Sequence, residues 1–297
     1  MSLGSRVLKF RQKFGHGLRV AYWRDVVRPR ILRTAPVTDL VDDRCEVHAL
    51  TCGADWLNLI WTLKSFYAAS KRRYKLCIHE DGTVGGSAVD ILAKHFPSAR
   101  IIQRCESDPR LAAKLSAYPR TQEFRETNLF ALKLLDPVEY LEARCILLLD
   151  SDILFFEAPD VLLQRADDPS YGLNCFNPDV DTGYTITPDM ARALFGVEME
   201  PRLNAGLGLV QPQSVRLDWI EEFLSAPAVP GGYFWRIEQT LVALLAARYG
   251  LEMLPWEYRV HLGRGIGHSP CRHYVGAVRH LMYSEGMRRL VREGFLR

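Results

Sequence analysis

Apolar and polar residues follow one another in blocks whose lengths predict strands and helices in alternation. Short apolar runs of strand length lie at 45–52, 74–79, 99–103 and 146–149. Stretches with helical spacing of apolar residues lie at 55–69, 88–95 and 126–135. Strands that alternate with helices are typical of an α/β fold, with a doubly wound, mostly parallel sheet flanked by helices.

The pattern changes after residue 152. We expect strands at 171–174 and 203–210 and helices at 219–224 and 239–249. Two loops rich in Gly, Pro and polar residues, 177–182 and 263–270, are long enough to act as lids. Composition does not shift along this part of the chain. We therefore expect one domain over residues 45–297, preceded by an extension of residues 1–44.

The extension is basic and amphipathic. Residues 1–34 contain nine Lys or Arg and one acid, so their net charge is +8 against −5 for the remainder. Apolar residues interleave with the bases, among them Leu8, Phe14, Tyr22 and Trp23. The sequence leaves two interpretations open: the segment lies on an anionic membrane surface, or it packs on the body with its charges in water. The acidic body argues against nucleic-acid binding.

Composition narrows the class of protein further. The chain has 297 residues, of which 48% are hydrophobic, and no apolar run approaches the ~20 residues that cross a bilayer. Its start lacks the apolar core of a secretory signal. The seven cysteines are dispersed, without a Cys-x-x-Cys pair. This distribution indicates reduced thiols in a cytoplasmic protein rather than a disulfide framework or a zinc site.

The strongest chemical signal is the pair Asp150 and Asp152, which directly follows the apolar run 146–149. In α/β sheets, ligands bind beyond the carboxyl ends of the strands. Two carboxylates held together repel each other unless a cation lies between them, and Mg²⁺ and Mn²⁺ prefer such oxygen ligands. The pattern therefore predicts a divalent metal site, although two solvated turn aspartates would give the same sequence.

This stretch resembles the metal-binding Asp-x-Asp of GT-A glycosyltransferases, especially the retaining family-eight group around glycogenin and bacterial lipopolysaccharide galactosyltransferases. The resemblance covers most of residues 45–280. It implies a GT-A fold with a Rossmann-like nucleotide-sugar-binding half. It also implies transfer of a hexose from a nucleoside diphosphate sugar, UDP above all, with retention, to a glycan, lipid or protein acceptor. Such an enzyme would work in the cytoplasm, peripherally at the inner membrane face if residues 1–34 bind lipid.

The stretch 273–279 looks like the family's C-terminal His-aromatic-x-Gly-x-x-Lys element. The resemblance makes His273 the third metal ligand beside Asp150 and Asp152, with Mn²⁺ or Mg²⁺ as the ion. Arg279 replaces the lysine that meets the diphosphate, and its planar fork suits phosphate oxygens. Lys133, 17 residues before Asp150, stands where the family places an arginine that braces the diphosphate.

Two further stretches resemble the family's sugar-binding elements. Asn204, in Asn-Ala-Gly, matches an asparagine that reaches donor sugar hydroxyls. Glu238 and Gln239 match the start of an Asp-Gln-Asp segment, in which the second residue faces the anomeric carbon and the first contacts sugar hydroxyls. Thr240 departs from the second aspartate of that segment, which puts an acceptor role there in doubt.

The first strand departs from the family pattern. In the family this strand ends with an acidic residue that binds the uracil base. Thr51 stands at this point, so backbone groups would take over the contact; Thr51 and Ser151 complete the expected donor site. These departures keep two other interpretations open. One is a sugar nucleotidyltransferase, and the other is a non-catalytic membrane-surface protein on a degenerate transferase fold.

Overall fold

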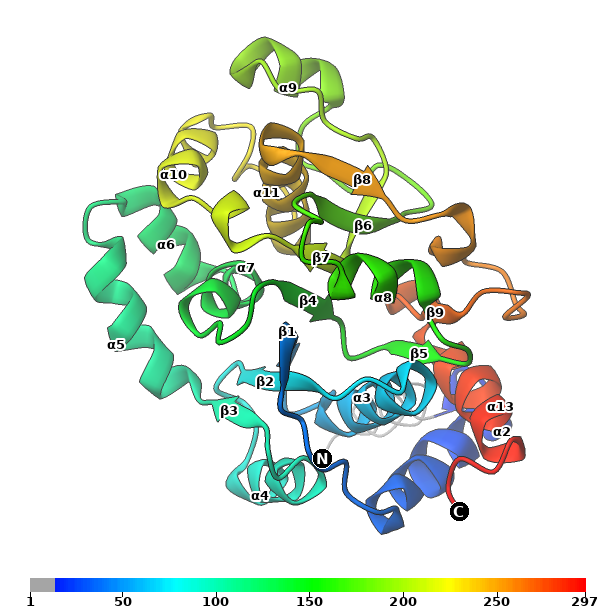
Figure 1. Ribbon diagram of the computed structural model, residues 1–297. Coiled ribbons are helices and arrows are strands. Elements are labelled where there is room, and N and C mark those ends of the chain that lie inside the picture. The colour runs from blue at the N-terminus through cyan, green and yellow to red at the C-terminus, as the bar shows by residue number, and fades with distance from the viewer. Residues whose placement is uncertain (1–13) are drawn as a thin grey trace, which may run out of the picture.

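A computed structural model of the chain describes residues 14–297 (Figure 1). The amphipathic pattern expected over residues 1–34 is therefore described from residue 14 onwards, and its first part lies outside the described residues. No helix within 14–297 is long and apolar enough to cross a membrane.

A seven-stranded sheet forms the centre of the fold, in the order β3-β2-β1-β4-β7-β6-β8. Its strands are β1 (Asp42–Thr51), β2 (Tyr74–Glu80), β3 (Arg100–Ile102), β4 (Ile146–Leu149), β6 (Asn174–Pro178), β7 (Leu203–Val210) and β8 (Leu251–Met253). The pairs among β3, β2, β1 and β4 are parallel, whereas β7 runs antiparallel to both β4 and β6. The predicted α/β class with a mostly parallel sheet is confirmed.

Helices cover both faces of this sheet (Figure 1). One hydrophobic core lies between the sheet and α3 (Trp56–Ser70), α4 (Gly86–His95) and α8 (Asp160–Asp167). The other includes α5 (Arg104–Leu115), α6 (Pro119–Thr127), α7 (Ala131–Glu139), α10 (Leu217–Ser225) and α11 (Phe234–Tyr249). Strand β4 joins the two cores, because Leu147 and Leu149 face the first while Ile146 and Leu148 face the second. Burial on both faces explains its uninterrupted apolar sequence.

A second, two-stranded sheet lies beside the first. It pairs β5 (Ile153–Phe155) with β9 (Cys271–His273) in antiparallel fashion, with Ile153 opposite His273. The backbone N–H of Tyr274 donates to the carbonyl of Asp152 at 2.9 Å. This register joins two segments about 120 residues apart in sequence. It places the C-terminal end of β9, with His273, beside the turn that contains Asp150 and Asp152.

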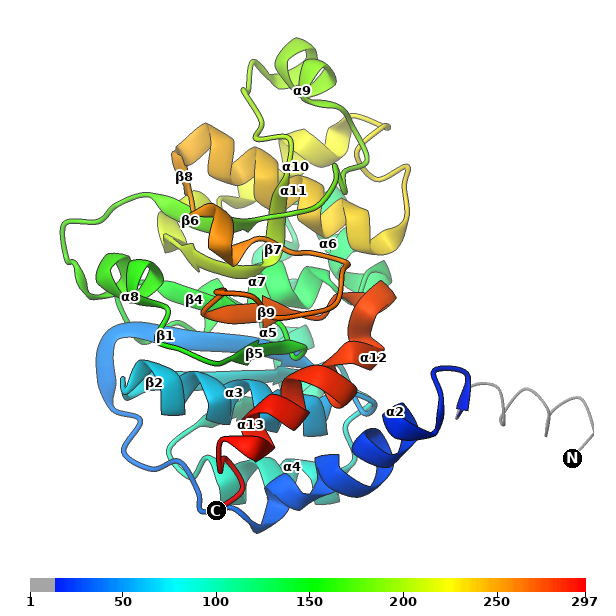
Figure 2. The same cartoon turned by 90° about the vertical axis from the view of Figure 1, so that its right-hand side faces the viewer.

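Residues 18–33 form one helical segment, made of α2 (Leu18–Tyr22), η1 (Trp23–Val27) and η2 (Arg28–Arg33). It lies beside the C-terminal helical segments α12 (Arg279–Leu281), η6 (Met282–Met287) and α13 (Arg288–Arg292) (Figure 2). The indole N–H of Trp61 on α3 donates to the Arg28 carbonyl at 2.9 Å, and Ile31 is fully buried. The inner side of this segment is therefore part of the folded body.

Two predicted elements were wrong in detail. The single helix expected at 126–135 is broken, because α6 ends at Thr127 and α7 begins at Ala131. Between them the Asn128 side chain accepts the Phe130 N–H at 2.9 Å, which offers the backbone a turn in place of a helix. The strand expected at 171–174 lies instead at Asn174–Pro178. Helix α5, which contains Pro109 and few apolar residues, was not predicted.

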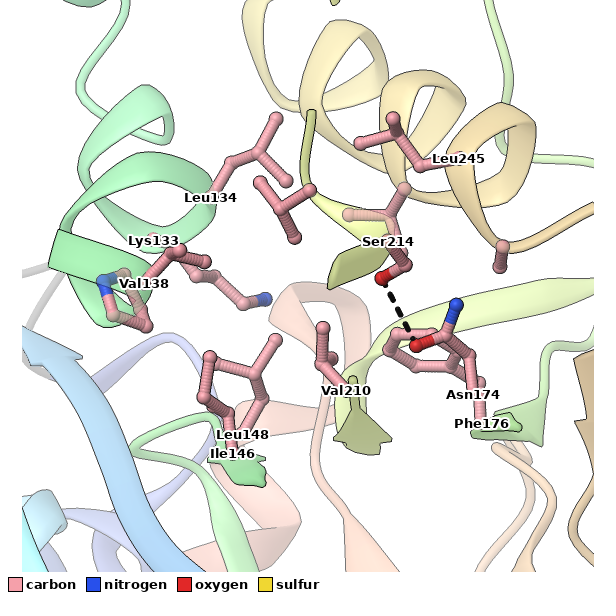
Figure 3. A pocket seen from close by; sticks show the side chains of 14 residues that line it. Lys133, Leu134, Val138, Ile146, Leu148, Asn174, Phe176, Val210, Ser214 and Leu245 are labelled. Carbon is pink, nitrogen blue, oxygen red and sulfur yellow. Dashed lines mark hydrogen bonds between the residues drawn. The ribbon is translucent and has the colours of Figure 1, made fainter. Parts of the chain in front are cut away.

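A small apolar cavity of about 20 Å³ lies between α7, α11 and the sheet (Figure 3). Side chains such as Leu148 and Val210 form its walls, and Ser214 donates a hydrogen bond to Asn174 at 3.1 Å along one side. The cavity has room for about one water. It is too small for a substrate, so we regard it as a packing defect of the second core.

Candidate active site

Asp150, Asp152 and His273 meet at the carboxyl end of β4. One ligand atom of each lies within 4.8 Å of the other two. The Asp150 N–H donates to the Gly206 carbonyl of β7 at 2.8 Å, and the β5–β9 pairing brings His273 to the other side. The three residues predicted as metal ligands are thus brought together by four different strands, namely β4, β5, β7 and β9.

The imidazole of His273 is oriented by Asn204. His273 Nδ1 lies 3.0 Å from Asn204 Oδ1, which also accepts the Gly206 N–H at 3.0 Å. Asn204 Nδ2 donates to Asp179 Oδ2 at 2.8 Å. Together these partners determine which terminal atom of the Asn204 amide is the oxygen and which is the nitrogen. Asn204 therefore keeps a proton on Nδ1 of His273 and leaves Nε2 facing the two carboxylates, as in histidines that bind metals.

Charges around Asp152 keep it ionised. Its Oδ1 lies 3.0 Å from His273 Nε2, and its Oδ2 lies 2.7 Å from Arg279 Nη2. Burial favours the neutral acid, but His273 and Arg279 outweigh it and lower the pKa of Asp152 to about 2. Burial likewise opposes a charge on His273, and Asp152 and Asp150 outweigh it and raise the pKa of that imidazole. A divalent cation here would take the place of this proton.

The space around these ligands tolerates only glycine at position 206. A Cβ atom there would overlap the ring of His273 and lie 2.7 Å from Asp150 Oδ2. Two carboxylates and one imidazole also form a donor set suited to Mn²⁺ or Mg²⁺. The residues therefore fit a hard divalent ion.

Two pockets meet at this cluster. The smaller, about 230 Å³, is lined by Thr51, Ser151 and their neighbours, and the larger, about 590 Å³, by Asn204, Glu238 and others. Both are lined by Phe130, Lys133, Asp150, Asp152 and Arg279. All ten residues predicted for the site therefore lie on the walls of these two pockets or at their junction.

Lys133 and Glu238 face each other across the junction. Lys133 Nζ lies 2.7 Å from Asp150 Oδ1 and 3.7 Å from Glu238 Oε1. Burial raises the pKa of Glu238 to about 7, although Lys133 acts in the opposite direction. Glu238 Oε1 is buried and has no hydrogen-bond partner among residues 14–297. A carboxylate oxygen that lacks a hydrogen bond beside a pocket is free to accept one from a ligand.

Gln239 and Thr240 differ in what they contact. Gln239 Nε2 lies 3.3 Å from the Gly183 carbonyl and 3.5 Å from Asp179 Oδ2, on the wall of the larger pocket. The Thr240 hydroxyl instead accepts the Thr185 N–H at 2.9 Å. Thr240 thus ties the chain after β6 to α11 and stabilises the pocket wall.

Four aspartates that line the pockets were not predicted, namely Asp55, Asp81, Asp179 and Asp181. Asp55 pairs with Arg279 at 2.9 Å, Asp81 lies in the smaller pocket, and Asp179 lines the larger one. The sequence positions of Asp55 and Asp81 could have predicted their place in the site. Asp55 directly precedes helix α3, and Asp81 directly follows β2, at the strand end where ligands bind. The sequence did not point to Asp179, because the strand that precedes it was predicted at 171–174 and lies at Asn174–Pro178.

Comparison of the sequence with protein-family models and with curated proteins gives no match. Solved structures do match. Mouse xyloside xylosyltransferase 1 in its apo form is 12% identical, with 78% of this chain and 98% of that chain covered and a TM-score of 0.52. The galactosyltransferase LgtC with donor and acceptor sugar analogs is 14% identical, with 78% and 87% covered and a TM-score of 0.51. These similarities show that the fold is of the GT-A type, as the sequence resemblance implied.

Proposed function

We propose that this chain, which has the fold of the GT-A glycosyltransferases, is a metal-dependent hexosyltransferase. It would move a hexose from a nucleoside diphosphate sugar to an acceptor. The observation that carries the proposal is the convergence of Asp150, Asp152 and His273 where two pockets meet. A sugar nucleotide has two unlike halves joined by a diphosphate, and two pockets joined at a cation site match that shape.

The residues at the junction would hold the diphosphate. Asp150, Asp152 and His273 would bind Mn²⁺ or Mg²⁺, which neutralises the charge that grows on the departing diphosphate. Lys133 and Arg279 add positive charge at the same place. Arg279 lies between Asp152 and Asp55 and lines both pockets, so its guanidinium is already directed at the junction.

We assign the nucleoside to the smaller pocket and the sugar to the larger one. Thr51 and Ser151 line the former, and UDP is the donor that the family resemblance implies. In the latter, Glu238 would contact sugar hydroxyls and Gln239 would lie beside the reacting carbon, with retention as the outcome. Asn204, expected to contact the sugar, has its amide occupied by His273 and Asp179. We therefore propose that it positions His273.

Hydrolysis of a panel of nucleotide sugars tests this function. The purified chain is incubated with UDP-, GDP- and ADP-hexoses in Mn²⁺, and the released nucleoside diphosphate is measured. We expect slow, Mn²⁺-dependent hydrolysis of a UDP-hexose, lost in EDTA and restored by excess Mn²⁺. A folded chain that neither binds nor hydrolyses any donor in Mn²⁺ would refute the proposal.

A parallel assay of the same chain with nucleoside triphosphates and sugar phosphates, in which released pyrophosphate is measured, distinguishes the first alternative. A sugar nucleotidyltransferase would release pyrophosphate from a nucleoside triphosphate and a sugar phosphate, and it needs a basic loop after its first strand. The loop 52–55 that follows β1 contains no Lys or Arg, so we favour glycosyl transfer. Donor binding without turnover would instead indicate a non-catalytic protein on this fold.

We further propose a weak association with anionic membrane surfaces. Leu18, Tyr22 and Val26, each four residues from the next, are 76%, 49% and 47% exposed and form an apolar stripe on the outer side of segment 18–33. Beside it lies a hollow of about 730 Å³ lined partly by Arg264, Arg288 and Arg292, which form no ion pair with any residue in 14–297. Exposed apolar residues beside unpaired arginines match an anionic bilayer surface, where the acceptor would be a lipid-linked or envelope glycan.

A further inference from the structure

A buried group of polar side chains lies between the central sheet and α7, away from the two pockets. It consists of Glu46 and His48 on β1 and of Cys77 and His79 on β2. All four are almost completely shielded from solvent. None of them lines either pocket of the candidate active site. The proposed transferase reaction gives them no role.

Strand geometry brings these side chains together. Side chains alternate between the two faces of a strand, so Val47 and Leu76 enter the core on the α3 side while the polar residues point to the opposite face. That face is covered by α7, which packs on β1 and β2. In the parallel register His48 lies opposite Cys77, and His79 is two residues further along the same face.

Glu46 sets the proton positions of the histidine pair. Glu46 accepts a hydrogen bond from Arg100 at 2.7 Å and one from the Glu142 N–H at 2.7 Å. Burial favours its neutral form, but His48, the Glu142 amide and Arg100 outweigh burial and lower the pKa of Glu46 to about 2. Its Oε2 lies 3.3 Å from His48 Nε2. This contact lies outside hydrogen-bond geometry, but the negative charge of the carboxylate favours the His48 tautomer with its proton on Nε2 and a lone pair on Nδ1.

That lone pair faces His79, because His48 Nδ1 lies 2.9 Å from His79 Nε2. Both imidazoles are buried between the strands and α7. Within residues 14–297, His79 Nδ1 has no hydrogen-bond partner and the Cys77 thiol takes part in no hydrogen bond. Unpaired polar atoms at this depth destabilise a fold unless they find a ligand.

We propose that His48, Cys77 and His79 bind a zinc ion. One ligand atom of each residue lies within 4.8 Å of the other two. Two imidazoles and a thiolate form a donor set that selects zinc over Mg²⁺ or Mn²⁺. Ligand atoms of a tetrahedral zinc site lie roughly 3.3–3.5 Å apart, as its bond lengths require, so small side-chain rotations would let these three residues take three of its four positions.

Glu46 then becomes the outer partner of a carboxylate–histidine–metal arrangement, which fixes the ring and strengthens the ligand. Binding replaces the thiol proton of Cys77, which leaves to solvent, and the thiolate charge is matched by the metal. The ion would join β1 to β2 beneath α7, so its role is structural. This site is independent of the proposed transferase function.

Metal content tests the site directly. The chain is purified from zinc-supplemented cells, dialysed against EDTA under native conditions and analysed for metals by elemental mass spectrometry. We expect a stoichiometric zinc content that survives dialysis, because the site is closed to solvent. It should persist in Asp152→Asn and in Cys175→Ser, a matched buried cysteine on β6. It should be lost in Cys77→Ser.

A second readout does not depend on how the variants fold. The wild-type chain is unfolded, freed of metal and refolded with Co²⁺, and its absorption is recorded. We expect a thiolate-to-cobalt charge-transfer band in the near ultraviolet, and a melting temperature above that of chain refolded with chelator. A wild-type chain that contains no zinc and shows no such band would overturn the proposal. So would zinc that is lost in Asp152→Asn but kept in Cys77→Ser.

Discussion

Asp152 is a residue with two partners, since one carboxylate oxygen faces His273 and the other faces Arg279. Asp152→Asn keeps the shape of the side chain and removes its charge. We expect Mn²⁺-dependent donor hydrolysis to fall at least ~100-fold, about 3 kcal/mol of lost transition-state stabilisation, with a cooperative melting curve retained. Asp90→Asn, an exposed aspartate on α4, is the control. Full activity of Asp152→Asn, or of the wild type in EDTA, would contradict the metal site.

Asn204 contacts His273, the proposed third metal ligand, through its side-chain oxygen. Asn204→Ala should weaken the apparent Mn²⁺ affinity ~10- to 100-fold, as expected when the outer partner of a ligating histidine is lost. Activity is measured against Mn²⁺ concentration at saturating donor. Asn174→Ala removes a buried asparagine in the second core and controls for lost stability. An unchanged Mn²⁺ requirement would show that Asn204 does not position His273.

Arg279 and Gln239 are expected to act at different stages of the reaction. Arg279 would hold the diphosphate in ground and transition states, so Arg279→Ala should raise the donor KM and lower kcat together. Gln239 would act as charge develops on carbon, so Gln239→Ala should lower mainly kcat. Steady-state hydrolysis of the preferred donor measures both, with Arg120→Ala as a remote control. The opposite pattern would reverse the two assignments.

At the scale of elements, the site depends on strand register. His273 meets Asp152 because it lies opposite Ile153 in the β5–β9 pair. A slip of one residue would turn the imidazole to the other face of the small sheet. The antiparallel β7 has a similar role, since its position beside β4 places Asn204 and Gly206 at the carboxyl end of β4.

Gly206 on β7 tests this dependence. Gly206→Ala puts a Cβ atom into the ring of His273, so the imidazole or the strand must move. We expect loss of Mn²⁺ binding, measured by calorimetry, and a lower melting temperature. Gly86→Ala on α4, where an added Cβ meets no atom within 4 Å, should leave both unchanged. Wild-type Mn²⁺ affinity in Gly206→Ala would show that the ligands lie elsewhere.

At the scale of the whole molecule, residues 18–33 have two sides. The inner side belongs to the body, so deletion of 1–34 would uncover Trp61 and destabilise the chain. A better change is the triple replacement of the exposed Leu18, Tyr22 and Val26 by Ser. It should lower the melting temperature far less than the deletion does, because Leu18 is mostly exposed and Tyr22 and Val26 are about half exposed.

We expect the wild-type chain to sediment with anionic, but not neutral, vesicles at low salt, and the triple-serine variant to sediment several-fold less. High salt should release the wild type, because screening weakens its attraction to the surface. Leu194→Ser, which changes an exposed leucine on helix α9 (Pro188–Phe195), is the matched control. If the wild type fails to sediment at low salt, or the triple variant sediments equally well, segment 18–33 is purely structural.

The sequence alone determined the helices and strands that have strong local patterns. It also indicated the kind of site, a divalent metal site at a strand end. The buried run 146–149 and the strand 203–210 lie where their apolar periodicity placed them, because burial of a strand is recorded in its own residues. The Asp-x-Asp pair and the stretch around His273 likewise predicted a metal site, and the structure brings these three side chains together. Only the tertiary structure decided which residues meet. The antiparallel direction of β7, the contact of Asn204 with His273, and the grouping of His48 with Cys77 follow from strand order and register. These depend on how distant segments pack together, and no local stretch of sequence records that.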